Sequence, residues 1–295
     1  MKYLVLDIGG SSIKYALITE ALEFIRRGEK SVPKENFEDL IEIIGELYDQ
    51  YKHEIEGIAI SFPGEIDSNR GYCYNAGSLS YSIGKEIKTI LEERCPTKIS
   101  IENDGNCAAL AELWKGSLKE CKDAIVIVLG TNIGGGIIID KKIYKGKQCF
   151  AGGFTFVSTN NSFPCEYDEI WGRKNGTERL TGALSHLKKE NLNEVNGYSF
   201  FEYANNGDEE VLEILDKFTQ TLVVQIFNLQ VILSPEKIAI GGGISAQNIL
   251  MNYIHKNIDE YYRNLKFSIS KPEILRCEFK NDANLIGALY NLIYC

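Results

Sequence analysis

The stretch IVIVLGTNIGGGIII, residues 125–139, decides the fold. Its β-branched residues run into three adjacent glycines and out into β-branched residues again, which predicts two buried strands joined by a glycine turn with positive φ. A turn without side chains lets backbone N–H groups approach an anion. The segment LVLDIGGSSIKYAL, residues 4–17, repeats this order of strand, glycine turn and strand. Both halves of the chain are therefore expected to begin alike.

The size and charge of the chain indicate its broad class. With 295 residues it exceeds the usual size of a single hydrophobic core, so two domains are expected. We expect an N-terminal α/β domain over 1–116 and a C-terminal α/β domain over 117–282, with a closing helix at about 283–295 that packs back on the first domain. The net charge of −9 argues against a nucleic-acid-binding surface, which needs clustered Lys and Arg.

From the sequence we expect neither a targeting signal nor a zinc site. The short apolar run at the N-terminus ends at Asp7, and no segment has the roughly 18 uninterrupted apolar residues of a membrane span. The chain is therefore expected to be cytoplasmic, with no membrane partner. The eight cysteines lack CxxC spacing, and none of the three histidines lies near a cysteine pair. This scatter argues against a disulfide framework and against a Cys/His zinc site.

Hydrophobic periodicity and turn residues predict the remaining elements. Strands are expected at 23–30, 57–62, 98–102 and 274–279, and from 237 into the glycines at 241–243. Helices are expected at 36–51, 83–93, 107–115, 177–189, 200–204, 209–233, 248–258 and 283–293, with Asp104 or Asn106 as the cap of the third. Loops are expected at 65–81 and 149–176, and long loops in compact domains are usually functional.

Three glycine-rich turns are each predicted to follow a strand: Gly9-Gly10, Gly134-Gly135-Gly136 and Gly241-Gly242-Gly243. The chain has neither a Walker A motif nor a GxGxxG that opens a helix, so P-loop and dinucleotide-binding folds fit poorly. The trio resembles the two phosphate motifs and the adenosine motif of the superfamily of sugar kinases, heat-shock chaperone ATPases and actin. This resemblance implies an α/β fold of two actin-like (ribonuclease H-like) domains, with mixed β-sheets flanked by helices, that close over a nucleotide in the cleft between them.

Within that superfamily the chain resembles the ROK sugar kinases over nearly its whole length. The motifs that carry the resemblance are DIGGSSIK (7–14), SFPG (61–64), ENDGNCA (102–108), GTNIGGG (130–136) and IGGGIS (240–245). Their order and spacing are specific together, whereas any one alone is not. ROK repressors carry an additional N-terminal helix-turn-helix, for which Asp7 lies too early in the sequence, so the kinase branch is expected.

The resemblance implies roles for the catalytic and nucleotide-binding residues. Asp104 is the general base that accepts the proton of the sugar hydroxyl, although in isolation it could equally be a helix cap. Asp7 holds Mg²⁺ through water, its alternative being a turn residue at a strand end. The remaining contacts are Gly9, Gly10, Ser11, Ser12, Thr131, Gly134 and Gly135 for the phosphates, and Gly241, Gly242 and Gly243 for the adenosine. Lys14 is interpreted as an exposed strand residue rather than a phosphate contact.

The sugar pocket is where the chain departs from the family pattern. Most ROK kinases have a Glu-x-Gly-His sugar motif and a Cys-rich zinc motif, but the matching segment here is AGGFTFV (151–157) and only Cys165-Glu166 remains of the zinc motif. The chain therefore resembles the zinc-less subgroup, which includes β-glucoside kinases and bacterial N-acetylmannosamine kinases. By resemblance the sugar contacts are Gly64, Asn75, Gly77, Asn103 and Asp104, with Glu166, Asp168 or Glu169 as candidates to replace the missing acid. Structural turn residues at 75–78 and a solvated acidic loop at 166–169 are the alternatives.

The expected function is that of a kinase that uses ATP and Mg²⁺, without zinc, to phosphorylate the 6-hydroxyl of a hexose or N-acylhexosamine, with N-acetylmannosamine as the favoured substrate. Glucokinase and β-glucoside kinase are the alternatives within this class. Because the sugar motif is incomplete, a pseudokinase that senses sugar without turnover is an alternative of another class. The presence of Asp7, Asp104 and all three glycine motifs argues against this alternative. The family also implies a homodimer.

Overall fold

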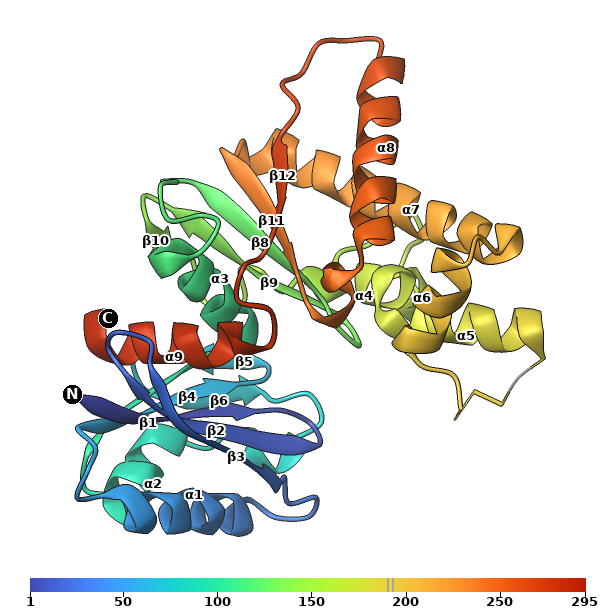
Figure 1. The fold of residues 1–295 in the computed structure, drawn as a ribbon. Coiled ribbons are helices and arrows are strands. Elements are labelled where there is room, and N and C mark those ends of the chain that lie inside the picture. The colour runs from blue at the N-terminus through green and yellow to red at the C-terminus, as the bar shows by residue number, and fades with distance from the viewer. Residues whose placement is uncertain (190, 193) are drawn as a thin grey trace. The chain divides into compact units, whose positions relative to one another are not determined.

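The computed structural model describes residues 1–189, 191–192 and 194–295, and this part of the chain divides into two compact units (Figure 1). Unit 1 comprises Met1–Lys119, Lys142–Gly152 and Asn281–Cys295. Unit 2 comprises Glu120–Lys141 and Gly153–Lys280. Each unit is therefore discontinuous in sequence.

The segment 142–152 departs from the expected domain division, which assigned it to the C-terminal domain. It belongs to unit 1, and its first strand is β10 (Lys142–Ile143). The physical reason is a set of contacts within unit 1: the Lys145 ammonium lies 2.6 Å from the Glu102 carboxylate and donates a 2.7 Å hydrogen bond to Ser68 Oγ. The first boundary falls at Lys119 rather than at Gly116.

Unit 1 is built on a five-stranded mixed sheet in the order β3-β2-β1-β4-β7. β1 pairs antiparallel with β2 and parallel with β4, and β4 pairs parallel with β7. The bounds are β1 (Lys2–Ile8), β2 (Ser12–Thr19), β3 (Phe24–Ser31), β4 (Gly57–Phe62) and β7 (Lys98–Asn103). The predicted N-terminal hairpin and its third strand are confirmed.

Both faces of this sheet are covered by helices because apolar side chains point alternately to either face of a strand. The helices of unit 1 are α1 (Phe37–Tyr51), α2 (Ile87–Arg94), α3 (Asp104–Lys115) and α9 (Ala283–Tyr294). Leu4 and Leu6 of β1 share a buried cluster with α1 and α2, whereas Tyr3 and Val5 share one with α9 and with Cys107 of α3. Figure 1 shows α1 and α2 on the opposite side of the sheet from α9.

Three predicted details of unit 1 were wrong. The expected loop at 65–81 contains a small hairpin of β5 (Glu65–Asp67) and β6 (Tyr72–Asn75) and a 3₁₀ turn at Ser80–Ser82. Helix α2 starts at Ile87 rather than at 83, because Gly84 has a φ of +80°, which is incompatible with a helix. Helix α3 starts at Asp104 rather than at 107, and its cap is the side chain of Asn103, which accepts from Asn106 N–H.

Unit 2 repeats the arrangement with strands hydrogen-bonded in the order β9-β8-β11-β12. β8 pairs antiparallel with β9 and parallel with β11, which pairs parallel with β12. The strands are β8 (Ala124–Leu129), β9 (Ile133–Ile139), β11 (Lys237–Gly241) and β12 (Glu273–Arg276). The helices are α4 (Trp171–Asn175), α5 (Thr177–Lys188), α6 (Gly197–Asn205), α7 (Glu209–Leu233) and α8 (Asn248–Asn264).

The glycine run at 134–136 does not form the turn that was predicted for it. The turn spans 130–132 and is closed by a hydrogen bond from Gly130 N–H to Asn132 O of 3.0 Å, while the glycine run lies inside β9. A Cβ at Gly135 would overlap Val126 O and lie 2.7 Å from the ring of Phe154. Gly135 therefore admits a close neighbour rather than a change of chain direction.

The expected loop at 149–176 holds three short helices, namely 3₁₀ turns at Phe154–Phe156 and Tyr167–Glu169 and then α4. Among these residues the Trp171 indole is fully buried and donates to Asn175 Oδ1 at 3.0 Å. Asn175 in turn donates to Phe218 O of α7 at 2.7 Å, so α4 is fixed to α7 within unit 2. Within the described residues, no helix has the length and apolar content to cross a membrane.

Candidate active site

Three neighbouring strands of unit 1 end in polar residues at one edge of the sheet. In the parallel register of these strands, Asp7 of β1 lies opposite Ser61 of β4, and Ser61 lies opposite Glu102 of β7. Asn103 and Asp104 follow directly, at the junction of β7 and α3. Residues about 100 positions apart in sequence are thus gathered at the carboxyl edge of one sheet, which is where open α/β sheets bind ligands.

Asp104 is held at the first turn of α3 by hydrogen bonds to one carboxylate oxygen. Its Oδ1 accepts from Gly105 N–H and from Asn103 Nδ2, both at 2.8 Å. Burial raises the pKa of Asp104 to about 6, and the negative charge of Asp7 adds to this rise, while the two hydrogen bonds oppose it. A partly buried carboxylate with a pKa near neutrality is suited to accept a proton at physiological pH.

Asp7 is fixed by two donors that sequence analysis did not identify. Ser61 Oγ at 2.9 Å and Asn284 Nδ2 of α9 at 3.0 Å both donate to Oδ1. Burial raises the pKa of Asp7, while these hydrogen bonds and the charge of Lys14 oppose the rise. The pattern SFPG pointed to the region of Ser61, but nothing in the sequence linked Asn284 to a residue 277 positions away.

The turn between β1 and β2 exposes its backbone and small side chains. Gly9 N–H donates to Ser12 O at 2.9 Å and closes the turn, and Gly10 and Ser11 are exposed at its tip. Lys14 is exposed on β2, in the register position opposite Asp7. This turn therefore has the exposed backbone that a phosphate group needs.

The residues predicted to bind sugar divide into two groups. Gly64 and Asn103 lie beside Asp104, because Asn103 Nδ2 donates to Gly64 O at 2.7 Å. Gly64 has a φ of +92°, and a Cβ there would overlap the carbonyl of Asn75, so only glycine fits. The Asn75 side chain accepts from Gly77 N–H at 3.1 Å, which gives these two residues a turn-forming role.

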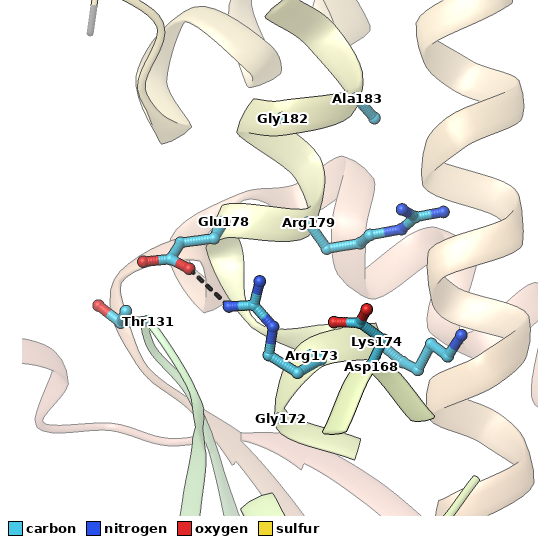
Figure 2. Close-up of a pocket in the computed structure, with 9 residues that line it drawn as sticks. All are labelled: Thr131, Asp168, Gly172, Arg173, Lys174, Glu178, Arg179, Gly182 and Ala183. Atoms are coloured by element: carbon cyan, nitrogen blue, oxygen red, sulfur yellow. Dashed lines mark hydrogen bonds and ion pairs between the residues drawn. The ribbon is translucent and has the colours of Figure 1, made fainter. Parts of the chain in front are cut away.

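Unit 2 contains a pocket of about 380 Å³ that combines a hydroxyl with three basic side chains (Figure 2). Thr131 reaches it from the turn between β8 and β9, and the other lining residues come from the segment around α4 and α5. Two of its cations are ion-paired, Arg173 with Glu178 at 3.0 Å and Lys174 with Glu169 at 2.7 Å. The lining residues are Thr131, Asp168, Gly172, Arg173, Lys174, Glu178, Arg179, Gly182 and Ala183.

The other predicted ligand residues of unit 2 have different surroundings. Glu169 is engaged by Lys174, and Glu166 is exposed. Gly242, at the end of β11, has a φ of +90°, and a Cβ there would overlap Leu129 O of β8. A Cβ at Gly243 would meet no atom within 4 Å. None of Gly134, Gly135, Gly241, Gly242 and Gly243 is among the residues that line the pocket described above.

The donor set available for a metal is small. No group of three or more His, Cys, Asp or Glu side chains in the described residues is placed to hold a metal ion. Asp7 accepts the hydrogen bonds from Ser61 and Asn284 at Oδ1, which leaves Oδ2 for another partner. A single carboxylate of this kind fits Mg²⁺, because Mg²⁺ keeps most of its water and is bound through one or two carboxylates together with substrate phosphates.

Comparison with known proteins agrees with this geometry. A sequence model described as ROK family matches residues 3–293. A glucokinase of Halalkalibacterium halodurans is 29% identical over 309 residues, covering 97% of this chain and 93% of the relative.

Solved structures match the fold over the whole chain. A Listeria monocytogenes protein whose description proposes an N-acetylmannosamine kinase superposes with a TM-score of 0.90 at 24% identity and covers 99% of both chains. A ROK glucokinase of Streptomyces griseus, in complex with glucose and AMPPNP, has a TM-score of 0.83 at 21% identity and covers 98% of both chains. The predicted fold class is therefore confirmed.

Proposed function

Because the chain belongs to the ROK family and is a sugar kinase, we propose that it transfers the γ-phosphoryl group of ATP to the 6-hydroxyl of a hexose or N-acylhexosamine, with N-acetylmannosamine as the favoured substrate. The observation that carries this proposal is the placement of Asp104. A carboxylate whose pKa is about 6 stands at the end of β7, with one oxygen fixed by Asn103 and Gly105. Phosphoryl transfer needs positioning and one proton acceptor more than it needs covalent chemistry by the protein.

The proposed reaction uses the residues of unit 1 to move one proton. Asp104 Oδ2 accepts the proton of the sugar hydroxyl as that oxygen forms a bond to the γ-phosphorus and the bond to the ADP oxygen breaks. Asn103 keeps the carboxylate in place through Oδ1. Asp7 would hold Mg²⁺ through water, and bound Mg²⁺ supplies charge neutralisation for the phosphates. The proton leaves Asp104 to solvent after the sugar phosphate departs.

The pocket of unit 2 supports a contribution of that unit to nucleotide binding. Thr131 offers a hydroxyl, and the guanidinium of Arg179 extends from α5 into the same pocket (Figure 2). Gly182 lies one turn further along α5, and a Cβ at this position would meet no atom within 4 Å. The pocket thus holds three basic side chains together with two acidic ones, and it is free of side-chain bulk at Gly182, which suits a phosphate chain near the basic side chains and a flat base at Gly182.

The test is a coupled assay of ADP formation with glucose, N-acetylmannosamine, N-acetylglucosamine and cellobiose, each with ATP and Mg²⁺. We expect turnover with at least one of these sugars, and the highest kcat/KM with N-acetylmannosamine. The position of the phosphate on the product is read by ³¹P–¹H correlation, with the 6-position expected. Sugar binding by calorimetry without ADP formation from any sugar would instead favour the sugar-sensing pseudokinase.

Glucokinase activity is the second candidate, because the curated relative of Halalkalibacterium halodurans carries that name at 29% identity. One missing hydrogen bond to a substrate hydroxyl can change specificity by orders of magnitude, so relatives of this identity can differ in substrate. A kcat/KM for glucose above that for N-acetylmannosamine would select this candidate, and a highest value for cellobiose would select a β-glucoside kinase.

A further inference from the structure

Glu102 is a buried carboxylate that the proposed reaction does not use. It lies at the end of β7, and its side chain is fully inaccessible to solvent. An isolated buried carboxylate costs several kcal/mol, so such a group persists only with a cation and a full set of donors. Its position two residues before Asp104 raises the question of what this charge does there.

Four donors satisfy the two oxygens of Glu102, and they fall into two pairs. Oε1 accepts from Asn103 N–H at 2.9 Å and from Asn106 Nδ2 at 3.0 Å. Oε2 accepts from Ser68 Oγ at 2.8 Å and lies 2.6 Å from Lys145 Nζ. One oxygen therefore binds the start of α3, and the other binds residues distant in sequence.

The first pair connects Glu102 to the proposed base in one further step. Asn103, whose N–H is held by Glu102, donates through its side chain to Asp104 Oδ1 and caps α3 through Asn106 N–H. A shift of the Glu102 carboxylate would therefore move both the backbone and the amide that orient Asp104. Misplacement of a reacting group by about 1 Å can cost 100-fold in rate.

The second pair connects Glu102 to the segment 142–152, which the chain enters from unit 2 and leaves toward unit 2. Lys145 is the cation of this segment that reaches the buried carboxylate, and it also donates to Ser68 Oγ at 2.7 Å. Its backbone carbonyl accepts from Ala151 N–H at 3.1 Å, which closes the segment on itself. Lys147 of the same segment is exposed and serves as a matched control.

From these contacts we propose that Lys145 is a positioning residue, which acts through Glu102 to hold Asn103 and Asp104 in the geometry for proton transfer. The inference rests on the proposed kinase function for its catalytic part. Without the ammonium, the buried Glu102 carboxylate keeps only the neutral donors Ser68, Asn103 and Asn106. Two of these three belong to the start of α3, so a shift of the carboxylate is passed to that first turn. A purely structural ion pair would lower stability and leave kcat unchanged.

The test compares Lys145→Met with Lys147→Met and with the double variant Glu102→Gln/Lys145→Met. We expect Lys145→Met to lower kcat about tenfold or more with little change in KM for ATP. The double variant removes both charges and keeps an oxygen that accepts from Asn103 N–H, so it should recover kcat to within about threefold of the wild type. Lys147→Met should match the wild type.

A second measurement does not depend on turnover. Hydrogen–deuterium exchange of the peptide that covers 103–107 should be faster in Lys145→Met than in the wild type and Lys147→Met, while exchange in β1 stays unchanged. Wild-type kcat, or wild-type exchange at 103–107, in a folded Lys145→Met variant would overturn the proposal. If the wild type itself phosphorylates no sugar, the proposed function fails, and the exchange measurement still decides whether Lys145 orders the start of α3.

Discussion

The two units begin with similar hairpins but place their glycines and charges differently. In unit 1 the glycines at 9–10 form the turn after β1, and the strand edge beside them carries the carboxylates of Asp7 and Asp104. In unit 2 the glycines at 134–136 lie inside β9, and Thr131 of the preceding turn borders a pocket with three basic side chains. A shared sequence pattern thus lies beside two carboxylates in one unit and beside a pocket with basic side chains in the other.

This difference predicts that variants of the two units change different kinetic constants. Changes at the carboxylate edge of unit 1 should alter kcat, whereas changes in the pocket of unit 2 should alter KM for ATP. The comparison fails if either unit's variants alter the other's constant.

The largest effect is expected from Asp104→Asn. The amide keeps an oxygen that can accept from Gly105 N–H and Asn103 Nδ2 but cannot take up the sugar proton, so kcat should fall by about 100-fold or more with KM for ATP near that of the wild type. Steady-state assays with the best sugar measure both constants. A variant that retains near-wild-type kcat would remove the assignment of the base.

The next effect is expected from Gly182→Leu in unit 2. A leucine at this position on α5 extends into the pocket, so KM for ATP should rise about tenfold while kcat stays within about twofold. Gly182→Ala is the matched control, because a Cβ there meets no atom within 4 Å and should leave KM unchanged. An unchanged KM for ATP in the leucine variant would place the nucleotide elsewhere.

A smaller effect is expected from pH. Since the pKa of Asp104 is raised from 3.8 to about 6, the base is protonated over an acidic range in which an ordinary aspartate would still be charged. The kcat/KM for sugar should therefore show an acidic limb near pH 6 and be roughly fourfold lower at pH 5.5 than at its plateau. A profile that stays flat down to pH 5 would contradict the raised pKa.

The smallest effect concerns stability and follows from the same carboxyl group. Between about pH 4 and pH 6 the folded state binds more protons at Asp104 than the unfolded state does, so stability falls as pH rises through this window and is constant above it. The Asp104→Asn variant has no carboxyl group to ionise at this position, so it does not lose stability as pH rises through this window. Its Tm should exceed that of the wild type by roughly 2–6 °C at pH 8 and by about zero at pH 4, as measured by calorimetry. If the variant and the wild type have equal Tm values at both pH 4 and pH 8, burial of the charged Asp104 carboxylate does not destabilise the folded state.

Much of the fold could be predicted because it depends on local patterns. The strands of unit 1 and the long helix α7 follow from apolar periodicity and turn residues over short windows, and α7 has the predicted bounds Glu209–Leu233. The family and fold class were predicted from the order of several motifs and are confirmed. The dimer, the role of Mg²⁺ and the choice of sugar stay predictions.

Several of the remaining errors have a common physical origin in contacts between distant segments. The glycines at 134–136 could be a turn or a strand by local rules, and the ring of Phe154 that packs on Gly135 lies 19 positions away. The hydrogen bond from Asn284 to Asp7 joins residues 277 positions apart, and the ion pair of Lys145 with Glu102 joins residues 43 positions apart. Local propensity contains no information on such pairs, whereas the residues within one motif, such as Asn103 and Asp104, were identified together.

The discontinuity of unit 1 affects how the protein is made. The ribosome releases β1 early, but the sheet face that carries Tyr3 and Val5 is covered by α9, the last helix of the chain. Helix α9 also packs tightly on α3, since a Cβ at Gly287 would overlap Cys107 O. The apolar face of the sheet that carries Tyr3 and Val5 therefore stays uncovered until α9 has been synthesised, and a nascent chain stalled before 283 is expected to need a chaperone.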